Sequence, residues 1–374
     1  MKFELIHQSK KSKARVGKIH TPHGIINTPN FVAVGTNGTI KSLDSCLVSQ
    51  IGLELMFCNT FHLLLQPGTE IIKKGGGLHK FINRNLPIIT DSGGFQVFSL
   101  AYGGVANELK SKGKKQIENG HVLKITEDGV SFRSYRDGSK ILLTPESSIQ
   151  AQKDLGADII IPFDELPPYH METSSLKNSL DRTHRWEIRS LNEHLKSPNN
   201  QAIYGVIHGG INKEFREESC KFLTDHPFDG FAIGGSMGKT KEEMMVVLHQ
   251  TIPHLPPEKP NHLLGIADTP SIDKFIPLGI DTFDSSYPTK AARHGTLLTK
   301  NGPQKIKTKS LSSTYAPIES DCTCFTCQNY TIAYLNHLFK SHELAGFTLA
   351  TIHNLHFMVN LMHSIRTQIL SDQI

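Results

Sequence analysis

The amino-acid sequence predicts an α/β protein: an eight-stranded, TIM-type β/α barrel followed by a smaller C-terminal subdomain. Eight short apolar runs recur along its 374 residues, and stretches with helical spacing separate most of them. This alternation is typical of parallel βα units, and eight such units favour closure into a barrel of about 250 residues. A doubly wound sheet is the alternative fold. The alternation stops after Thr299, where we place the start of the subdomain.

The first 30 residues precede this alternation. Short strands are expected over Phe3–Ile6 and Gly17–Ile19, so we interpret residues 1–30 as a lid or plug and residues 31–299 as the barrel. The expected barrel strands are Phe31–Val34, Leu53–Phe57, Ile88–Thr90, Asp158–Pro162, Ala202–Ile207, Gly230–Ile233, His262–Ile266 and Asp281–Phe283. The expected helices include Ser147–Leu155, Lys213–Leu223 and Lys241–Leu248.

Composition narrows the class of protein. A hydrophobic content of 38% with 20% charged residues is typical of a soluble globular chain. The basic N-terminus has no apolar run behind it, and no stretch approaches 18 apolar residues, so neither a signal peptide nor a membrane span is expected. Six cysteines in a chain of this length are too few for a disulfide framework. Because free cysteines are typical of a reducing compartment, we expect a cytoplasmic protein. The net charge of +5 permits a polyanionic partner.

Polar or glycine residues follow six of the expected strands. In a β/α barrel the strand ends carry the active site, so these residues are candidates for it. The stretch after Ile88–Thr90 is the most suggestive, because adjacent glycines let the backbone approach a bound group and an aromatic ring follows. Such a site suits a flat, polar heterocycle. The strand ends are Asp91-Ser92-Gly93-Gly94-Phe95, Phe163-Asp164-Glu165, His208-Gly209-Gly210, Gly234-Gly235-Ser236, Gly265-Ile266-Ala267-Asp268 and Phe283-Asp284-Ser285-Ser286.

Two of these carboxylates suggest a reaction. Asp284 precedes Lys290, Arg293 and His294, so a reactive acid would stand beside an anion-binding loop. Paired with Asp91 across a barrel mouth, Asp284 could attack a sugar carbon while the other carboxylate handles the proton of the departing base. The alternative is two independent capping aspartates. These residues alone do not decide between the two.

A cysteine cluster marks the C-terminal subdomain, residues 300–374. The spacing Cys322-x-Cys324-x-x-Cys327 lets three thiolates converge on one ion, and a distant histidine would complete a closed, structural zinc site. His353 is one candidate for the fourth ligand. His337, His342, His356 and His363 are the others. Cys46, Cys58 and Cys220 are expected to be small core residues.

The segment Ala101–Val122 interrupts the alternation. It contains Lys110, Lys112, Lys114 and Lys115, and we interpret it as an exposed insertion. Placed near the open end of the barrel, it would also be able to touch a phosphate backbone.

Together these motifs resemble the tRNA-guanine transglycosylase family, in the same order and over about residues 3 to 365. The residues that carry the resemblance are Asp91–Val97, Phe163-Asp164-Glu165, Phe283-Asp284 with Pro288-Thr289, and the cysteine triplet with His353 in Thr-Ile-His-Asn. The resemblance implies a zinc-bearing β/α barrel that is usually a homodimer. It also implies exchange of the wobble guanine in the anticodon loop of certain tRNAs for a deazaguanine base, a step of queuosine biosynthesis.

The resemblance assigns roles by position. It implies Asp284 as the nucleophile, Asp91 as the general acid/base and His353 as the fourth zinc ligand. The base would lie among Ser92, Gly93, Gly94, Phe95, Asp164, His208 and Gly235, with Phe95 stacking on it. The anticodon loop would lie on Gly265, Ile266, Ala267, Asp268, Thr269, Pro270 and Ser271, and on Thr289, Lys290, Ala291, Ala292 and Arg293.

Three positions depart from the bacterial pattern of the family. Leu166 stands where a cysteine is usual, and His208 stands where a glutamine is usual. The loop Gly234–Lys239 is one residue shorter than usual and carries Lys239 in place of a glutamate that helps to hold the cationic aminomethyl precursor. A lysine there would repel that cation, so we expect queuine as the incoming base. The aminomethyl deazaguanine is the alternative, with Lys239 directed away.

Two other classes of function compete with transglycosylation. A non-catalytic RNA-binding relative is one, and the presence of both Asp91 and Asp284 argues against it. A zinc-dependent hydrolase is the other, and it predicts a catalytic rather than a structural metal.

Overall fold

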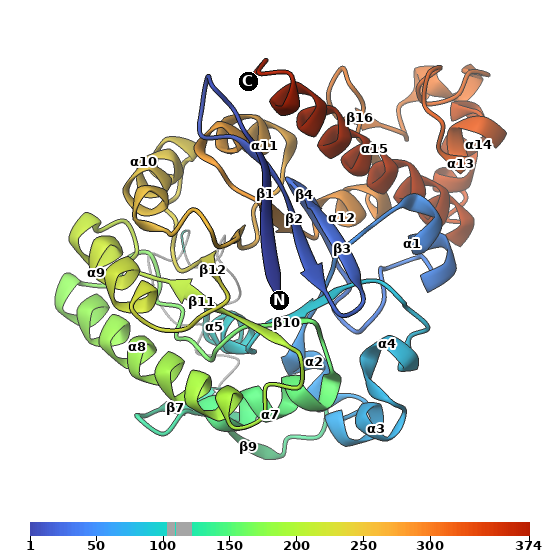
Figure 1. Ribbon diagram of the computed structural model, residues 1–374. Coiled ribbons are helices and arrows are strands. Elements are labelled where there is room, and N and C mark those ends of the chain that lie inside the picture. The colour runs from blue at the N-terminus through green and yellow to red at the C-terminus, as the bar shows by residue number, and fades with distance from the viewer. Residues whose placement is uncertain (103–108, 110–121) are drawn as a thin grey trace.

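A computed structural model describes residues 1–102, 109 and 122–374. It confirms the barrel: eight parallel strands close in the order β10-β11-β12-β13-β14-β4-β5-β6, which excludes the doubly wound alternative. Helices surround the barrel, as Figure 1 shows for α7 to α11. The barrel strands are β4 (Asn30–Val34), β5 (Met56–Cys58), β6 (Ile88–Thr90), β10 (Ile159–Ile160), β11 (Ala202–Ile207), β12 (Gly230–Ile233), β13 (Asn261–Leu263) and β14 (Thr282–Ser285).

The helices between the strands begin at side-chain caps. Thr144 and Ser147 form a capping box at the start of α7, Asn212 caps α9 and Thr240 caps α10, because each side chain satisfies a backbone N–H in the first turn. The three expected helices therefore exist, and all of them extend beyond the predicted bounds, α9 by a single residue. The helices up to residue 293 are α1 (Ser45–Ile51), α2 (Thr60–Leu65), α3 (Thr69–Lys74), α4 (Gly77–Phe81), α5 (Gly94–Tyr102), α7 (Pro145–Leu155), α8 (Thr173–Leu195), α9 (Lys213–Thr224), α10 (Lys241–Thr251), α11 (Thr269–Phe275) and α12 (Tyr287–Arg293), with 3-10 turns at Ile252–His254 and Ile276–Leu278.

A separate antiparallel sheet covers the end of the barrel at which the strands begin. It consists of β1 (Lys2–Gln8), β2 (Arg15–Thr21) and β3 (Gly24–Thr28), and its blue strands cross in front of the barrel in Figure 1. Ile19 and Ile26 pack in one core with Val32, Leu55 and other barrel residues. This sheet therefore lies at the end opposite to the polar strand ends and leaves those accessible.

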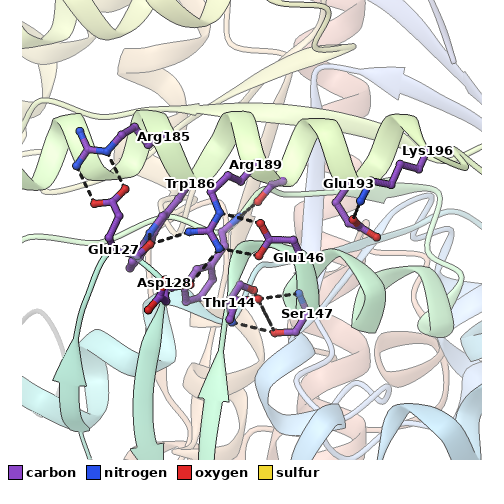
Figure 2. Close-up of polar contacts among 12 residues, drawn as sticks. Glu127, Asp128, Thr144, Glu146, Ser147, Arg185, Trp186, Arg189, Glu193 and Lys196 are labelled. Carbon is purple, nitrogen blue, oxygen red and sulfur yellow. Dashed lines mark hydrogen bonds and ion pairs between the residues drawn. The ribbon is translucent and has the colours of Figure 1, made fainter.

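A second antiparallel sheet was not predicted. It lies between β6 and β10 and consists of β7 (Val122–Ile125), β8 (Val130–Arg133) and β9 (Lys140–Leu143). Figure 2 shows how α8 holds it: Arg185 forms ion pairs with Glu127 at 2.7 and 2.9 Å, and the Trp186 indole donates to the Glu127 carbonyl at 2.8 Å. Arg189 joins the same turn to Glu146 of α7. The lysines at 110–115 lie outside the described residues.

The C-terminal part begins with the short hairpin β15 (Thr296–Leu297) and β16 (Gln304–Lys305) and a 3-10 turn at Lys309–Ser313. The helices α13 (Phe325–Asn329), α14 (Ile332–Lys340) and α15 (Leu344–Leu370) follow. Helix α15 packs on α12, α1, β2 and β4, so it joins the last residues to the first part of the chain. Within the described parts of the chain, no helix combines the length and the apolar character that crossing a membrane requires.

Candidate active site and metal centre

The predicted strand-end residues meet at one end of the barrel. Ser92, which follows β6, donates to Asp164 Oδ1 at 2.8 Å, and His208 Nε2 lies 2.9 Å from Asp164 Oδ2. On the other side of the mouth, the Gly265 N–H donates to Asp284 Oδ1 at 2.7 Å. Residues far apart in sequence thus line one surface, because all eight strands point the same way.

Asp91 is a buried carboxylate with both oxygens in use. Asn59 and Gln96 donate to Oδ2 at 2.5 and 2.9 Å, and the Thr60 N–H donates to Oδ1 at 2.8 Å. Burial raises the pKa of the Asp91 carboxyl from 3.8 to about 6, against the lowering effect of these hydrogen bonds. A carboxyl group with such a pKa can give or take a proton near neutral pH.

Asp284, the second carboxylate, has a different environment. Its Oδ1 accepts hydrogen bonds from His262 and from the Gly265 backbone at 3.1 and 2.7 Å. Among the hydrogen bonds of the described residues, none reaches Oδ2. Asp284 is largely buried, with 7% of it exposed, and this second oxygen is the one available to a ligand.

A set of polar groups surrounds Asp164. Gly94 makes room for Asp164, because a Cβ on Gly94 would lie 2.8 Å from Asp164 Oδ1. Gly235, whose φ is +75°, makes room for His208, because a Cβ there would lie 2.9 Å from His208 Nδ1. His208 Nδ1 is buried without a hydrogen-bond partner in the described structure. A buried donor or acceptor without a partner costs free energy, so this nitrogen is suited to pairing with a ligand.

A buried arginine fixes the loops after β11 and β12. The Arg216 guanidinium, fully buried, donates to the carbonyls of Ile207 and Gly234 at 2.8 and 2.9 Å and also reaches Gly210 and Ser236. Since His208 and Gly235 belong to these loops, Arg216 sets their spacing. Four supporting residues were not predicted as part of the site. They form hydrogen bonds to the site residues or to their loops, and they are Asn59, Gln96, Arg216 and His262.

An apolar hollow extends from the polar cluster. It is small and open to solvent. Phe163 and Trp186 stack in its wall with ring centroids 4.9 Å apart. Leu166 and Pro168 also line the hollow. Phe95, the expected stacking ring, is 48% exposed at the start of α5.

The two expected RNA-binding segments both follow strands at the mouth. In the first, Gly265 and Pro270 are exposed, whereas Ala267 and Ser271 are buried. In the second, Lys290 is exposed and Arg293 is half-buried, whereas Thr289, Ala291 and Ala292 are buried. Of the five residues of the second segment, only Lys290 and Arg293 present a charged side chain that is not buried.

The cysteine triplet and one histidine converge, as expected. The His353 Nδ1 atom lies 3.8, 3.6 and 3.4 Å from the sulfurs of Cys322, Cys324 and Cys327. His353 Nε2 donates to the Leu298 carbonyl at 2.8 Å, which directs Nδ1 toward the sulfurs. His356 instead lies beside Thr323 and Asn360.

Three thiolates and one imidazole, all within 4.8 Å of one another, fit a tetrahedral zinc ion with no open position. The remaining cysteines correct one expectation. Cys58 and Cys220 are buried, but Cys46 is exposed on α1 and is no core residue.

Comparison with known proteins agrees with this geometry. A family model described as "Queuine tRNA-ribosyltransferase" matches residues 9–374. A protein of that name from Protochlamydia amoebophila is 67% identical over 373 residues, which cover 100% of this chain and 96% of the relative. Proteins of the same name from Chlamydia caviae and Chlamydia trachomatis serovar D are 56% and 55% identical, and each match covers 100% of both chains. The chain therefore belongs to the queuine tRNA-ribosyltransferase family, the tRNA-guanine transglycosylases.

Proposed function

We propose that this protein replaces the wobble guanine of tRNAs with GUN anticodons by a 7-deazaguanine base, through a covalent ribosyl ester of Asp284. The observation that carries the proposal is the asymmetry of the two mouth carboxylates. Asp284 presents an oxygen without a hydrogen bond in the described structure, as a nucleophile requires, whereas Asp91 is fully hydrogen-bonded and has a pKa of about 6, as a proton carrier requires.

The two residues divide the work of a double displacement. The target nucleotide leaves its stack and enters the mouth. Asp284 Oδ2 forms a bond to C1′ as the C1′–N9 bond breaks, and its electron pair passes to guanine, which takes a proton from Asp91. The incoming base then gives its proton back to Asp91 and attacks C1′ as the Asp284 ester breaks. The RNA strand stays intact throughout.

The pKa of Asp91 sets a pH dependence. Guanine must take a proton from Asp91 in the first step, so we expect the rate of guanine release to fall as the pH rises through about 6 and Asp91 loses that proton. Stability changes in the same direction. Because the folded-state pKa is above the ordinary 3.8, the contribution of Asp91 to stability is complete below that value and is lost as the pH rises through about 6. Rate and thermal unfolding measured over the same pH range test both signs.

Gly94 tests the base-reading role of Asp164. In G94A the new methyl group would meet the Asp164 carboxylate and carbonyl, so Asp164 must shift. We expect a KM for the incoming base that is about tenfold higher or more, together with a lower melting temperature because the Asp164 backbone must move as well. A variant with the wild-type KM would contradict the placement of the base. G138A is a control for the backbone strain of a glycine substitution, because a Cβ at Gly138 meets nothing within 4 Å while its φ is +73°.

Two observations support queuine as the incoming base. The apolar hollow beside Asp164 opens to solvent, so a substituent on the base would be able to extend outward through it. Lys239 Nζ lies 5.1 Å from the centre of the ring of Tyr169, the residue that follows Pro168 of the hollow. The Glu243 carboxylate accepts hydrogen bonds from the Lys239 backbone N–H and from the Tyr169 hydroxyl. An ammonium group in this place would disfavour a cationic base.

The experiment measures release of labelled guanine from tRNA, with queuine and its aminomethyl precursor offered separately. We expect release by queuine, and improved use of the precursor in K239E. Release by the precursor alone would overturn the proposed preference. No release with either base would favour a non-catalytic RNA-binding protein.

We further propose one structural zinc ion on Cys322, Cys324, Cys327 and His353, and three parts at residues 1–30, 31–299 and 300–374. The tRNA anticodon loop would lie on the two mouth segments described above, and we place the enzyme in the cytoplasm. Exposed aromatic side chains on the C-terminal part, among them Tyr315 and Phe325, support a homodimer.

A further inference from the structure

A buried histidine touches the proposed nucleophile. His262 of β13 is 0% exposed, and its Nε2 lies 3.1 Å from Asp284 Oδ1. Its Nδ1 lies 2.8 Å from the Thr282 hydroxyl, and its ring packs against Phe57. A carboxylate only accepts hydrogen bonds, so Nε2 must carry the proton and donate it. The ring is therefore held in one orientation, aimed at Asp284.

Both donors to Asp284 reach the same oxygen. The His262 N–H and the Gly265 N–H share Oδ1, and Oδ2 is left without a hydrogen bond in the described structure. Oδ1 thus accepts both hydrogen bonds, and Oδ2 is the oxygen available to a ligand. If Asp284 attacks through Oδ2, His262 stays in contact with the carboxyl group in both its free and its esterified form.

We propose that His262 is a positioning residue that sets the balance between the free Asp284 carboxylate and its ribosyl ester. The inference rests on the proposed function. In the forward step Oδ2 bonds to C1′, the C1′–N9 electron pair leaves with guanine, and the carboxylate loses its negative charge. A hydrogen bond to a charged acceptor is about twice as strong as one to a neutral acceptor. His262 therefore stabilises the free carboxylate more than the ester.

This preference has a direction that can be measured. It disfavours accumulation of the covalent intermediate and helps Asp284 to leave when the incoming base attacks C1′. Loss of the His262 donor should make the ester more stable relative to the free enzyme. A role in packing alone predicts the opposite, because a misplaced Asp284 would form less ester.

Two substitutions separate the nitrogens of the ring. Gln can place an amide N–H near the position of Nε2, so H262Q keeps a donor to Asp284. Asn reaches only as far as Nδ1, so H262N keeps a partner for Thr282 but loses the donor to Asp284. The pair has matched polarity and differs in the one contact that the proposal needs.

The experiment mixes the full-length protein with a GUN-anticodon tRNA, without an incoming base, and measures the covalent protein–RNA adduct on a denaturing gel. Added guanine reverses the first step, so the guanine concentration that halves the adduct reports the equilibrium. We expect this concentration to rise about tenfold or more in H262N and to stay near the wild-type value in H262Q. An unchanged or lower value in H262N would overturn the proposal.

Two further variants complete the test. D284N should form no adduct, and an adduct in that variant would overturn the assignment of the nucleophile rather than the role of His262. T282V keeps the imidazole but removes the hydroxyl that orients it, so a smaller rise in the same direction is expected. This variant decides the question if thermal unfolding shows that H262N does not fold, since an unchanged value in T282V would also overturn the proposal.

Discussion

Replacing Asp284 with Ala or Asn is expected to abolish base exchange. Without a carboxylate at this position no ribosyl ester can form, and loss of an enzyme nucleophile usually lowers kcat by at least about a thousandfold. The fold should survive in D284N, because the two hydrogen-bond donors to Asp284 also suit an Asn side-chain oxygen. The measurement is the rate of guanine release under saturating tRNA and base.

Controls make this result specific. The melting temperature and the metal content of D284N should match those of the wild type. Asp273, exposed on α11, offers a matched aspartate, and D273N should exchange bases at the normal rate. Exchange that persists in D284A with unchanged kinetics would remove Asp284 from the reaction.

Loss of the metal ligands is expected to have the largest effect on stability. The cluster joins the loop at Cys322–Cys327 to α15, and His353 also bonds the Leu298 carbonyl beside β15. A structural zinc site contributes its binding free energy to folding. We expect C324S and H353A to lose the metal, to unfold the C-terminal part and to lower the melting temperature by about 10 °C or more.

Chelation separates a structural metal from a catalytic one. If the metal is structural, activity and the circular dichroism of the helices should disappear together when a chelator removes the ion. A protein that stays folded but loses activity at once would instead support a zinc-dependent hydrolase. H356A is the matched control, since His356 lies on the same helix but contacts Thr323 and Asn360, and it should keep its metal.

The sequence allowed most of the barrel to be predicted because its strands are continuous apolar runs, buried on both sides. Where the predicted strands were wrong or missing, the cause is local. The strand expected over His262–Ile266 ends at Leu263, because the Gly265 N–H turns toward Asp284. The sheet β7–β9 was missed, although Asp128-Gly129 and Asp137-Gly138 are the kind of dipeptide that joins antiparallel strands.

The candidate site was predictable where residues follow strands and was hidden where residues support others. Asp91, Asp164 and Asp284 stand out as polar residues after apolar runs. His262 lies inside such a run, and nothing in its neighbours indicates that β14 will place a carboxylate beside it. Asn59 and Gln96 meet Asp91 only because β5 and β6 pair and α5 turns back. Pairing of neighbouring parallel strands creates these contacts.

The pairing of the first barrel strand with the last has a consequence for synthesis on the ribosome. Strand β4 lacks one neighbouring strand until β14 has been made, and it also packs on α15, which is made last. During translation the growing chain therefore carries an open, apolar sheet edge for almost its whole length, a state that is prone to aggregate. Pairing with β14 and the later docking of α15, rather than formation of any earlier βα unit, shield this strand.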